Sequence, residues 1–174
     1  MTEPTDQQLI AQYLKGNEQS LEVLIKRYLK PIYSFVCKNI GNQEKAQDIT
    51  QEVFLKAWRN LKKFDKKKSF KSWLFTIAKN SSIDFLRQKK TEVFLSENLV
   101  CEKSDFTESI DNKNIAKKIH NALQELSPNY RAVFLLKNES NLTFREIAQE
   151  LNEPLNTIKS RYRRAVLILK NLMN

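Results

Sequence analysis

Apolar residues recur along most of this chain at intervals of three and four, and only rarely at intervals of two. Such spacing places them on one face of an α-helix, whereas a half-buried strand needs strict alternation. The chain has only 2 glycines and 4 prolines, which leaves little material for the turns of a sheet. The pattern therefore predicts an all-α protein. The expected helices cover residues 6–15, 18–39, 43–61, 69–87, 111–126, 128–136, 144–151 and, from 154 or 156, the stretch to 173.

Residues that favour helix ends separate these segments. Gly41 follows the second helix, and glycine readily adopts the positive φ that often closes a helix. Ser69 can accept a hydrogen bond from the first turn of the fourth helix. Thr143 and Glu146 have the spacing of a capping box, and Asn152 occupies the turn after that helix. A short helix, a tight turn and a further helix predict a helix-turn-helix unit near the C-terminal end.

Residues 91–110 interrupt the helical pattern. They contain five acidic residues and one lysine, and their apolar residues do not repeat at helical spacing. We therefore expect an N-terminal four-helix domain over residues 1–90 and a C-terminal four-helix domain over residues 111–174, joined by this acidic linker. In the isolated protein we expect the linker to act as a tether, and its apolar residues suit docking on a partner.

The formal net charge is +10, and basic blocks flank the acidic linker. A basic surface favours polyanions, chiefly nucleic acid or an anionic membrane surface. No run of about 20 apolar residues suits a membrane span. Residues 1–15 lack the pattern of a signal peptide, so we expect a cytoplasmic protein. Cys37, Cys101 and His120 do not form a ligand motif, so no disulfide, metal site or other cofactor is expected.

The loop 62–68 and the helix after it combine positive charge with aromatic rings. The loop carries five lysines and one acid. Lysines neutralise phosphates, and ring faces stack on unpaired bases with about 1–3 kcal/mol each. This combination is typical of a site for single-stranded nucleic acid. The residues alone leave a second interpretation open, in which Phe70, Trp73 and Phe75 belong to the core and the lysines form a solvated loop.

The last helix has a basic face opposite its apolar stripe. Ile158, Ala165 and Leu169 belong to the stripe, and the other side is polar and basic. Such a helix fits the major groove of duplex DNA, although a basic face alone is also consistent with simple solvation. The candidate residues on or beside this face are Asn156, Thr157, Lys159, Ser160, Arg161, Arg163 and Arg164.

Four ordered motifs resemble the sigma-70 family of bacterial RNA polymerase initiation factors. The resemblance to its region two rests on DITQEVFLKAW at residues 48–58 and on F-x-x-W-L-x-x-I-A-x-N-x-x-x-D-x-L-R at residues 70–87. The resemblance to region four rests on L-S-P-x-x-R-x-V-F at residues 126–134 and on T-x-x-E-I-A-x-x-L-N-x-P-x-N-T-I-K-S-R-x-x-R-A at residues 143–165. The family usually has glycine where Asn156 stands. The short chain is similar to the extracytoplasmic-function (ECF) subfamily.

The resemblance implies a sigma factor that binds core RNA polymerase, at the β′ clamp and the β subunit, and directs promoter-specific initiation. The expected polymerase contacts on the helix 43–61 are Asp48, Gln51, Glu52, Phe54 and Trp58. The expected contacts to a melted −10 element, with a flipped base near Asn80, are Lys66, Lys67, Lys68, Lys71, Trp73, Asn80 and Arg87. The last helix is expected to read the −35 element of the promoter DNA as duplex. A cognate anti-sigma factor is a further expected partner, and no small-molecule substrate is expected.

Two other classes of protein compete with this interpretation. A two-domain helix-turn-helix regulator would bind duplex DNA without polymerase, but it would not need the region-two pattern. An enzyme is disfavoured because the sequence has no phosphate-binding loop, nucleophile elbow or metal cluster. A gel shift separates the first two classes, since a regulator shifts duplex DNA alone and a sigma factor does so well only with core polymerase.

Overall fold

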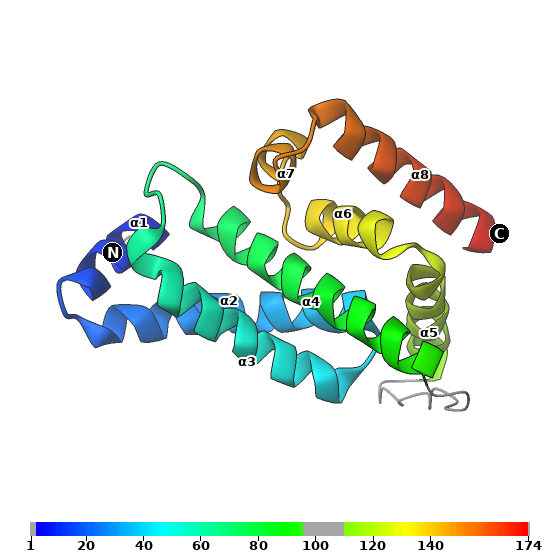
Figure 1. Cartoon of the computed structure of the whole chain (residues 1–174), viewed down its shortest axis with the longest axis horizontal. Coiled ribbons are helices and arrows are strands. Elements are labelled where there is room, and N and C mark those ends of the chain that lie inside the picture. Colours follow the sequence, from blue (N-terminus) through cyan, green and yellow to red (C-terminus); the bar gives the residue numbers. More distant parts are fainter. Residues whose placement is uncertain (1–2, 96–109, 174) are drawn as a thin grey trace.

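The computed structural model describes the backbone of residues 3–95 and 110–173, and this part of the chain contains helices and no strand (Figure 1). The all-α prediction is confirmed. The helices are α1 (Asp6–Leu14), α2 (Glu18–Ile40), α3 (Gln43–Asn60), the 3₁₀ helix η1 (Leu61–Lys63), α4 (Phe70–Leu95), α5 (Ile110–Glu125), α6 (Pro128–Asn138), α7 (Phe144–Leu151) and α8 (Leu155–Met173).

Most helix ends are formed by the residues that favour them in the sequence. Gly41 closes α2 with a φ of 75°, and Asn152 closes α7 with a φ of 51°. The Thr143 hydroxyl accepts from the backbone N–H of Glu146, whose carboxylate accepts from the backbone N–H of Thr143, as the capping-box pattern predicts. The sequence Ser127-Pro128 predicts an N-cap followed by proline at the first helical position, and the cap is wrong. Ser127 makes no capping hydrogen bond through its side chain, so α6 starts on the proline alone.

The fourth helix extends beyond its predicted end. The expected end was Arg87, but α4 continues to Leu95. No glycine or proline lies in residues 69–127, so nothing in the sequence forces the helix to stop there. Of the expected linker, residues 96–109 lie outside the described residues.

We call α1 to α4 the N-terminal half and α5 to α8 the C-terminal half. Helix α4 belongs to the N-terminal half and lies where the two halves meet (Figure 1). It packs against α2 and α3 on one side and against α6 and α7 on another. The single apolar stripe that helical spacing predicts for this helix, which includes Phe70, Leu74 and Ile77, is therefore incomplete, since Phe75 and Ile83 are also buried. Phe75 is fully buried, with its ring edge-to-face against Phe35 at 5.4 Å between centroids. Small buried Ser72 and Ser82 let neighbouring helices approach this helix from more than one direction.

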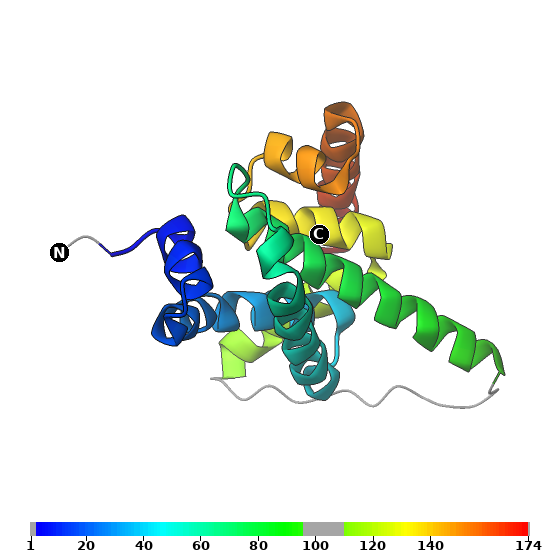
Figure 2. The ribbon, with the colours of Figure 1, turned by 60° about the vertical axis from the view of Figure 1, so that its left-hand side comes forward.

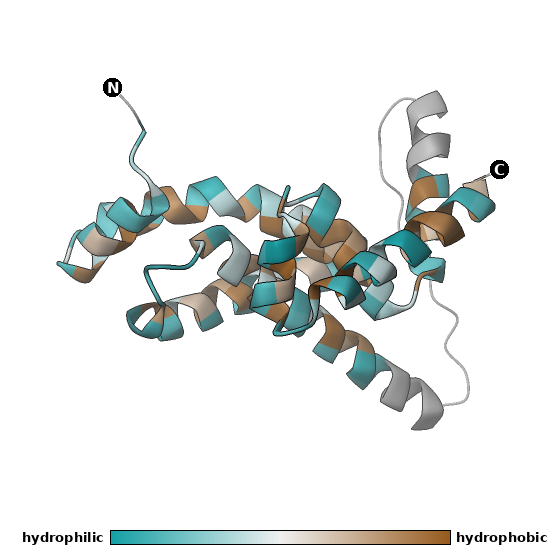
Figure 3. Ribbon diagram, turned by 90° about the horizontal axis from the view of Figure 1, so that it is seen from above, coloured by the Kyte–Doolittle hydropathy of each residue, from teal (hydrophilic) through white to brown (hydrophobic). Residues whose placement is uncertain are grey.

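The two halves share one continuous hydrophobic cluster, which runs from Leu9 in α1 to Leu169 in α8. Figure 3 shows hydrophobic positions gathered where the helices meet and hydrophilic ones on their outer turns. Contacts between α2 and both α5 and α6 join the halves, as do contacts between α4 and both α6 and α7. The sequence did not predict this association. The domain boundaries at 90 and 111 remain a prediction, because most of the expected linker lies outside the described residues.

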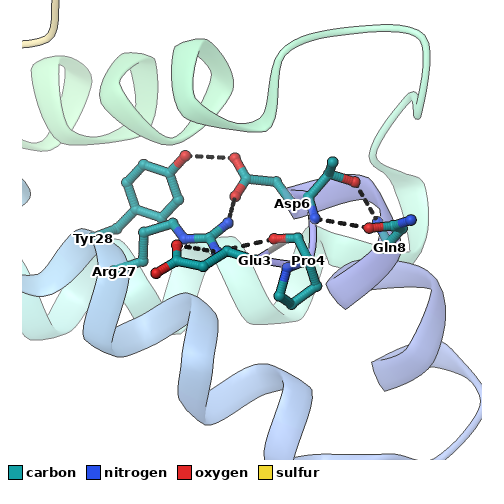
Figure 4. A network of polar contacts seen from close by, with 7 residues as sticks. Glu3, Pro4, Asp6, Gln8, Arg27 and Tyr28 are labelled. Atoms are coloured by element: carbon teal, nitrogen blue, oxygen red, sulfur yellow. Dashed lines mark hydrogen bonds and ion pairs between the residues drawn. The ribbon is translucent and has the colours of Figure 1, made fainter. Parts of the chain in front are cut away.

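A polar network fastens α1 to α2 (Figure 4). The Asp6 carboxylate accepts from Arg27 Nη1 at 2.6 Å and from the Tyr28 hydroxyl at 2.5 Å. Burial, assisted by this carboxylate, raises the pKa of Tyr28. The Tyr28 ring also packs edge-on against Phe70 at the start of α4, 5.6 Å between centroids. The network thereby positions the beginning of α4, and Gln7 Nε2 donates to the Lys66 carbonyl at 3.3 Å in the loop before it.

We predict that Tyr28→Phe and Asp6→Asn destabilise the fold non-additively. Each change removes or weakens one hydrogen bond to a charged group, a type that contributes about 1.5–3 kcal/mol. The measurement is urea unfolding of both single variants and the double variant. Because the side chains share one bond, the double variant should lose less free energy of unfolding than the sum, with a coupling of at least about 0.5 kcal/mol. Additive losses would contradict the network.

Candidate nucleic-acid and polymerase interfaces

An open hollow of about 520 Å³ lies between α3 and α4. Trp73 and Asn80 border it, and both were predicted to contact DNA. Trp73 is half-buried and Asn80 is exposed, so a ring edge and an amide are both available to a ligand. The full lining is Lys56, Asn60, Lys63, Trp73, Ile77, Asn80 and Ser81. We call this feature the α3–α4 hollow.

Two buried aromatic rings hold Trp73 in place. Its ring centroid lies 5.0 Å from that of Phe64 and 5.7 Å from that of Phe70. Phe64 and Phe70 are buried, at 7% and 2% exposure. The core interpretation of the aromatic residues is therefore right for Phe70 and Phe75, while Trp73 lies at the boundary between core and surface. Such packing limits the rotamers of the indole and pre-organises it for stacking.

Sequence reasoning missed the α3 side of the hollow. Lys56 Nζ donates to Ser81 Oγ at 3.1 Å and forms an ion pair with Glu52 at 2.6 Å. Lys56, Asn60 and Lys63 are spaced by four and three, which places them on one side of α3 and η1. That spacing was a usable signal. What the sequence did not reveal is that this side of α3 faces Trp73 and Asn80 across a gap.

The residues predicted to bind the −10 element lie on more than one face of α4. Trp73, Ile77 and Asn80 are spaced by four and three and share the face of the hollow. Lys71 and Lys79 lie on the opposite side, where α7 packs. Lys66 and Lys67 are exposed at the tip of the loop, and Lys68 follows half-buried. Arg87 lies about 10 Å further along the helix axis than Asn80.

The basic loop is shaped by its one acid. Asp65 Oδ1 accepts from the backbone N–H of Lys67 at 3.0 Å, and the Asp65 carbonyl accepts from the N–H of Lys68 at 2.9 Å. These bonds form a tight turn that directs the intervening side chains outward. Together with the bond from Gln7 to the Lys66 carbonyl, they give the lysines a defined starting geometry.

Helix α3 presents an exposed face with mixed chemistry. Asp48, Gln51 and Glu52 are exposed, as a protein-binding face requires. Leu55 is 48% exposed and follows at the same helical spacing, so it extends this face and was not predicted. Phe54 is different from the other candidates, because it is 8% exposed and packs edge-on against Trp58 at 5.9 Å. Phe54 thus supports half-buried Trp58 and offers little surface of its own.

The predicted basic face of α8 is exposed for the most part. Asn156, Lys159, Ser160, Arg163 and Arg164 are exposed, and Thr157 is half-buried. Arg161 is an exception, since it pairs with Glu153 in the preceding turn at 2.6 Å. Arg164 Nη1 donates to the Tyr130 hydroxyl at 3.2 Å, which adds an α6 residue to this surface. The helix is anchored by Tyr162, whose ring packs on Phe134 and Phe144 at 5.9 and 5.2 Å.

Two classes of site find no support within the described residues. In residues 3–95 and 110–173, no helix is long and apolar enough to cross a membrane. The same part of the chain holds no group of three histidine, cysteine or acidic side chains that could bind a metal ion. Cys37 is buried, and burial raises the pKa of its thiol. Cys101 lies outside the described residues.

Comparisons with known proteins cover both halves of this structure. Residues 24–92 match the family model of sigma-70 region 2, and residues 116–169 match that of sigma-70 region 4. The ECF RNA polymerase sigma factor SigW of Bacillus subtilis is 30% identical over 167 residues, which cover 89% of each protein. This chain belongs to the ECF sigma factors. The ECF RNA polymerase sigma-E factor of Escherichia coli is 27% identical, over 92% of this chain and 90% of that protein.

Solved structures share the arrangement of this ECF sigma factor. The sigma factor RpoE from Bartonella quintana, in complex with the anti-sigma factor NepR, has a TM-score of 0.78 at 25% identity and covers 89% of this chain and 97% of its own. CnrH, in complex with the cytosolic domain of CnrY, has the same fold, with a TM-score of 0.75 at 23% identity over 97% of this chain and 96% of its own.

Family membership identifies the general function. As a sigma factor, the protein associates with RNA polymerase and supports promoter-specific initiation of transcription. The interpretation as a stand-alone helix-turn-helix regulator is therefore set aside, since the region-two match covers the N-terminal half. Sigma factors act as initiation factors and are not known as enzymes.

We predict different effects on stability for two substitutions of Asn152, in the turn before α8. Asn152 has a φ of 51°, a conformation that costs most L-residues about 1–2 kcal/mol but costs glycine almost nothing. Asn152→Ala should lower the free energy of unfolding by roughly 1 kcal/mol. Asn152→Gly should leave it unchanged or raise it slightly. Thermal unfolding of the two variants checks this pair, and equal stability of both would contradict the strained turn.

Proposed function

We propose that this ECF sigma factor reads a melted −10 strand at the α3–α4 hollow and a duplex −35 element with α8. The observation that carries the proposal is the composition of the hollow, where Trp73 and Asn80 face Lys56 and Lys63 across a space open to solvent. Aromatic rings, amides and ammonium groups are the three groups that bind an unpaired nucleotide through base stacking, base edges and phosphates.

The −10 step follows from these side chains. A base that leaves the duplex costs a few kcal/mol in lost stacking, and its pocket must return that free energy. The Trp73 indole offers a ring face or edge held by Phe64 and Phe70. The Asn80 amide has both a donor and an acceptor, so it can bond the Watson–Crick edge of the flipped base. The lysines around the hollow and in the 62–68 loop hold the backbone without selecting sequence.

The −35 step uses the exposed half of α8. Lys159, Arg163 and Arg164 are exposed on a helix whose first turns follow a tight turn, as in helix-turn-helix units that enter the major groove. Arg161 already pairs with Glu153, so its proposed part is to hold the helix against the turn. The side chain of Asn156 stands where the family usually has glycine, and it is exposed on the same half of the helix.

The polymerase contact belongs to α3 in this proposal. Asp48, Gln51 and Glu52 form its polar part, and exposed Leu55 supplies an apolar centre. A small apolar group surrounded by charges is the usual composition of a protein interface. We propose the β′ clamp as the partner of this face, with a β-subunit contact in the C-terminal half. An anti-sigma factor is proposed as a further partner because the solved relative RpoE is bound to NepR. All of these partners place the protein in the cytoplasm.

The decisive experiment for the −10 assignment uses Asn80→Ala holoenzyme on promoters with a pre-opened −10 bubble. We expect discrimination among the non-template bases to fall at one position, by about 1–3 kcal/mol, or roughly five- to 150-fold in affinity. Asn171→Ala at the exposed end of α8 is the matched control and should keep wild-type discrimination. An equal loss of affinity for every bubble sequence would instead assign Asn80 a structural part.

We predict that Asp48→Arg weakens core-polymerase binding while the helix content stays unchanged. Asp48 is exposed, with only a long contact of 3.6 Å to Lys45, so its reversal alters the charge of the face without disturbing the core. A reversed rim charge mainly slows association. Co-purification with core polymerase and circular dichroism are the two readouts. Glu22→Arg on α2 makes the same charge change and should bind like wild type, and wild-type binding by Asp48→Arg would place the contact elsewhere.

A further inference from the structure

Helix α8 lies along the outside of the molecule, and it begins after the turn that follows α7 (Figures 1 and 2). Its buried residues are Ile158, Ala165 and Leu169. At about 100° per residue, Asn156 lies roughly 200° from Ile158 and roughly 180° from Ala165 around the helix axis. Asn156 is exposed, as that position requires. The side chain at the centre of the outward face is therefore a neutral amide in the first turn of the helix.

The arginines toward the edges of this face already have partners within the protein. Arg161 pairs with Glu153 at 2.6 Å, and Arg164 Nη1 donates to the Tyr130 hydroxyl at 3.2 Å. Within the part of the chain that the structure describes, no hydrogen bond engages the Asn156 amide. Both its donor and its acceptor are left for a ligand.

Asn156 also does not cap its own helix. Asn17 and Asn42 are caps, because their side chains accept from the first turns of α2 and α3. In α8 the cap position belongs to Pro154, whose carbonyl accepts from the backbone N–H of Ile158 at 3.2 Å. Asn156 is thus the second residue inside the helix, where alanine would be the better helix former. Local helix stability gives no reason for an asparagine at this position.

An exposed amide on this face suits one base of duplex DNA. In the major groove, adenine presents its N7 acceptor and its N6 amino donor side by side, and an amide can bond both at once. Guanine presents two acceptors there, while cytosine presents only a donor, so either base leaves one end of the amide unpaired. Lys159 and Arg163 on the same face favour guanine or phosphate. They therefore do not duplicate a preference for adenine.

The place of Asn156 along the helix fits a contact to a base edge. In helix-turn-helix units, the N-terminal residues of the second helix are the ones that reach base edges in the major groove. Arg163 lies about 10 Å further along the axis, and its longer side chain can reach past the groove floor to the backbone. A phosphate contact by the Asn156 amide would carry no sequence information, so an experiment can separate it from base reading.

From these observations we infer that Asn156 reads an adenine in the major groove of the −35 element. Its Nδ2 donates to N7 of the base, and its Oδ1 accepts from the N6 amino group. The inference rests on the proposed function, since it requires α8 to lie in the −35 duplex. It goes further because it names the base and assigns it to one side chain. The promoter preference of this sigma factor then contains an adenine that the cations of α8 do not specify.

The test uses holoenzyme with wild-type or Asn156→Ala protein and a promoter library randomised across the −35 element. We expect the wild type to select adenine at one position, and Asn156→Ala to reduce that preference by about five- to 150-fold. Preferences at the other −35 positions should remain. Asn171→Ala makes the same change at the exposed end of α8, and it should select like wild type. Circular dichroism and co-purification with core polymerase should not differ among the three proteins.

Base analogues at the selected position identify the bonding atoms. 7-Deazaadenine lacks the N7 acceptor, and unsubstituted purine lacks the N6 amino group. Each should weaken binding of the wild-type holoenzyme several-fold and leave binding of the Asn156→Ala holoenzyme unchanged, because that variant no longer uses these atoms. 3-Deazaadenine changes only the minor-groove edge, so both holoenzymes should bind it as they bind adenine.

Three results would overturn the inference. An equal loss of affinity for every −35 sequence would make Asn156 a phosphate contact or a structural residue. A lost preference for another base would exclude adenine. Wild-type selection by Asn156→Ala would exclude any base contact at this position. Lys159→Ala and Arg163→Ala then separate this failure from a failure of the proposed function. If either variant alters −35 binding, α8 still contacts the element, and if neither does, the proposed −35 function fails as well.

Discussion

The burial of α4 on two sides is the constraint on which the rest of this structure depends. A helix that packs against α2 and α3 on one side and α6 and α7 on another cannot have a single apolar stripe. Large side chains such as Phe75 fill the core on one side, while small Ser72 and Ser82 admit neighbouring helices closely. Only the remaining sector is left for solvent, and Trp73 and Asn80 lie there. Packing therefore selects which residues of this helix are available to a ligand.

Local interactions account for the part of the fold that the sequence could predict. Helical spacing and caps act within a few residues, so Gly41, Thr143 and Asn152 were recognisable without any tertiary information. The extension of α4 to Leu95 and the packing of the two halves were not predictable in this way. The end of α4 had no local signal, because residues 69–127 contain no glycine or proline that would mark it. The packing of the two halves depends on contacts such as Gln124 with Lys38, which are 86 positions apart.

The same division holds for the candidate interfaces. Trp73 and Asn80 could be named because a family motif contains them, and the exposed residues of α8 followed from one helical face. Lys56 and Lys63 were missed because their role depends on which side of α3 faces α4. Phe54 illustrates the opposite error, since position on a helix does not reveal that a neighbouring ring covers it. Contact surfaces between helices are a tertiary property, and spacing along one helix only limits the choice.

The buried guanidinium of Arg131 forms hydrogen bonds both within the C-terminal half and to the end of α2. Burial lowers the pKa of its guanidinium to about 10, and that group donates to the Gln124 side chain and to the carbonyls of Asn39, Gln124 and Leu126. Only the Asn39 carbonyl belongs to the other half. Separation would thus leave three of these four acceptors in place, and the carbonyl at the end of α2 would take a water molecule instead. The turn between α5 and α6 would keep its internal bonding, so this guanidinium stabilises the C-terminal half by itself and adds one hydrogen bond to the junction with the end of α2.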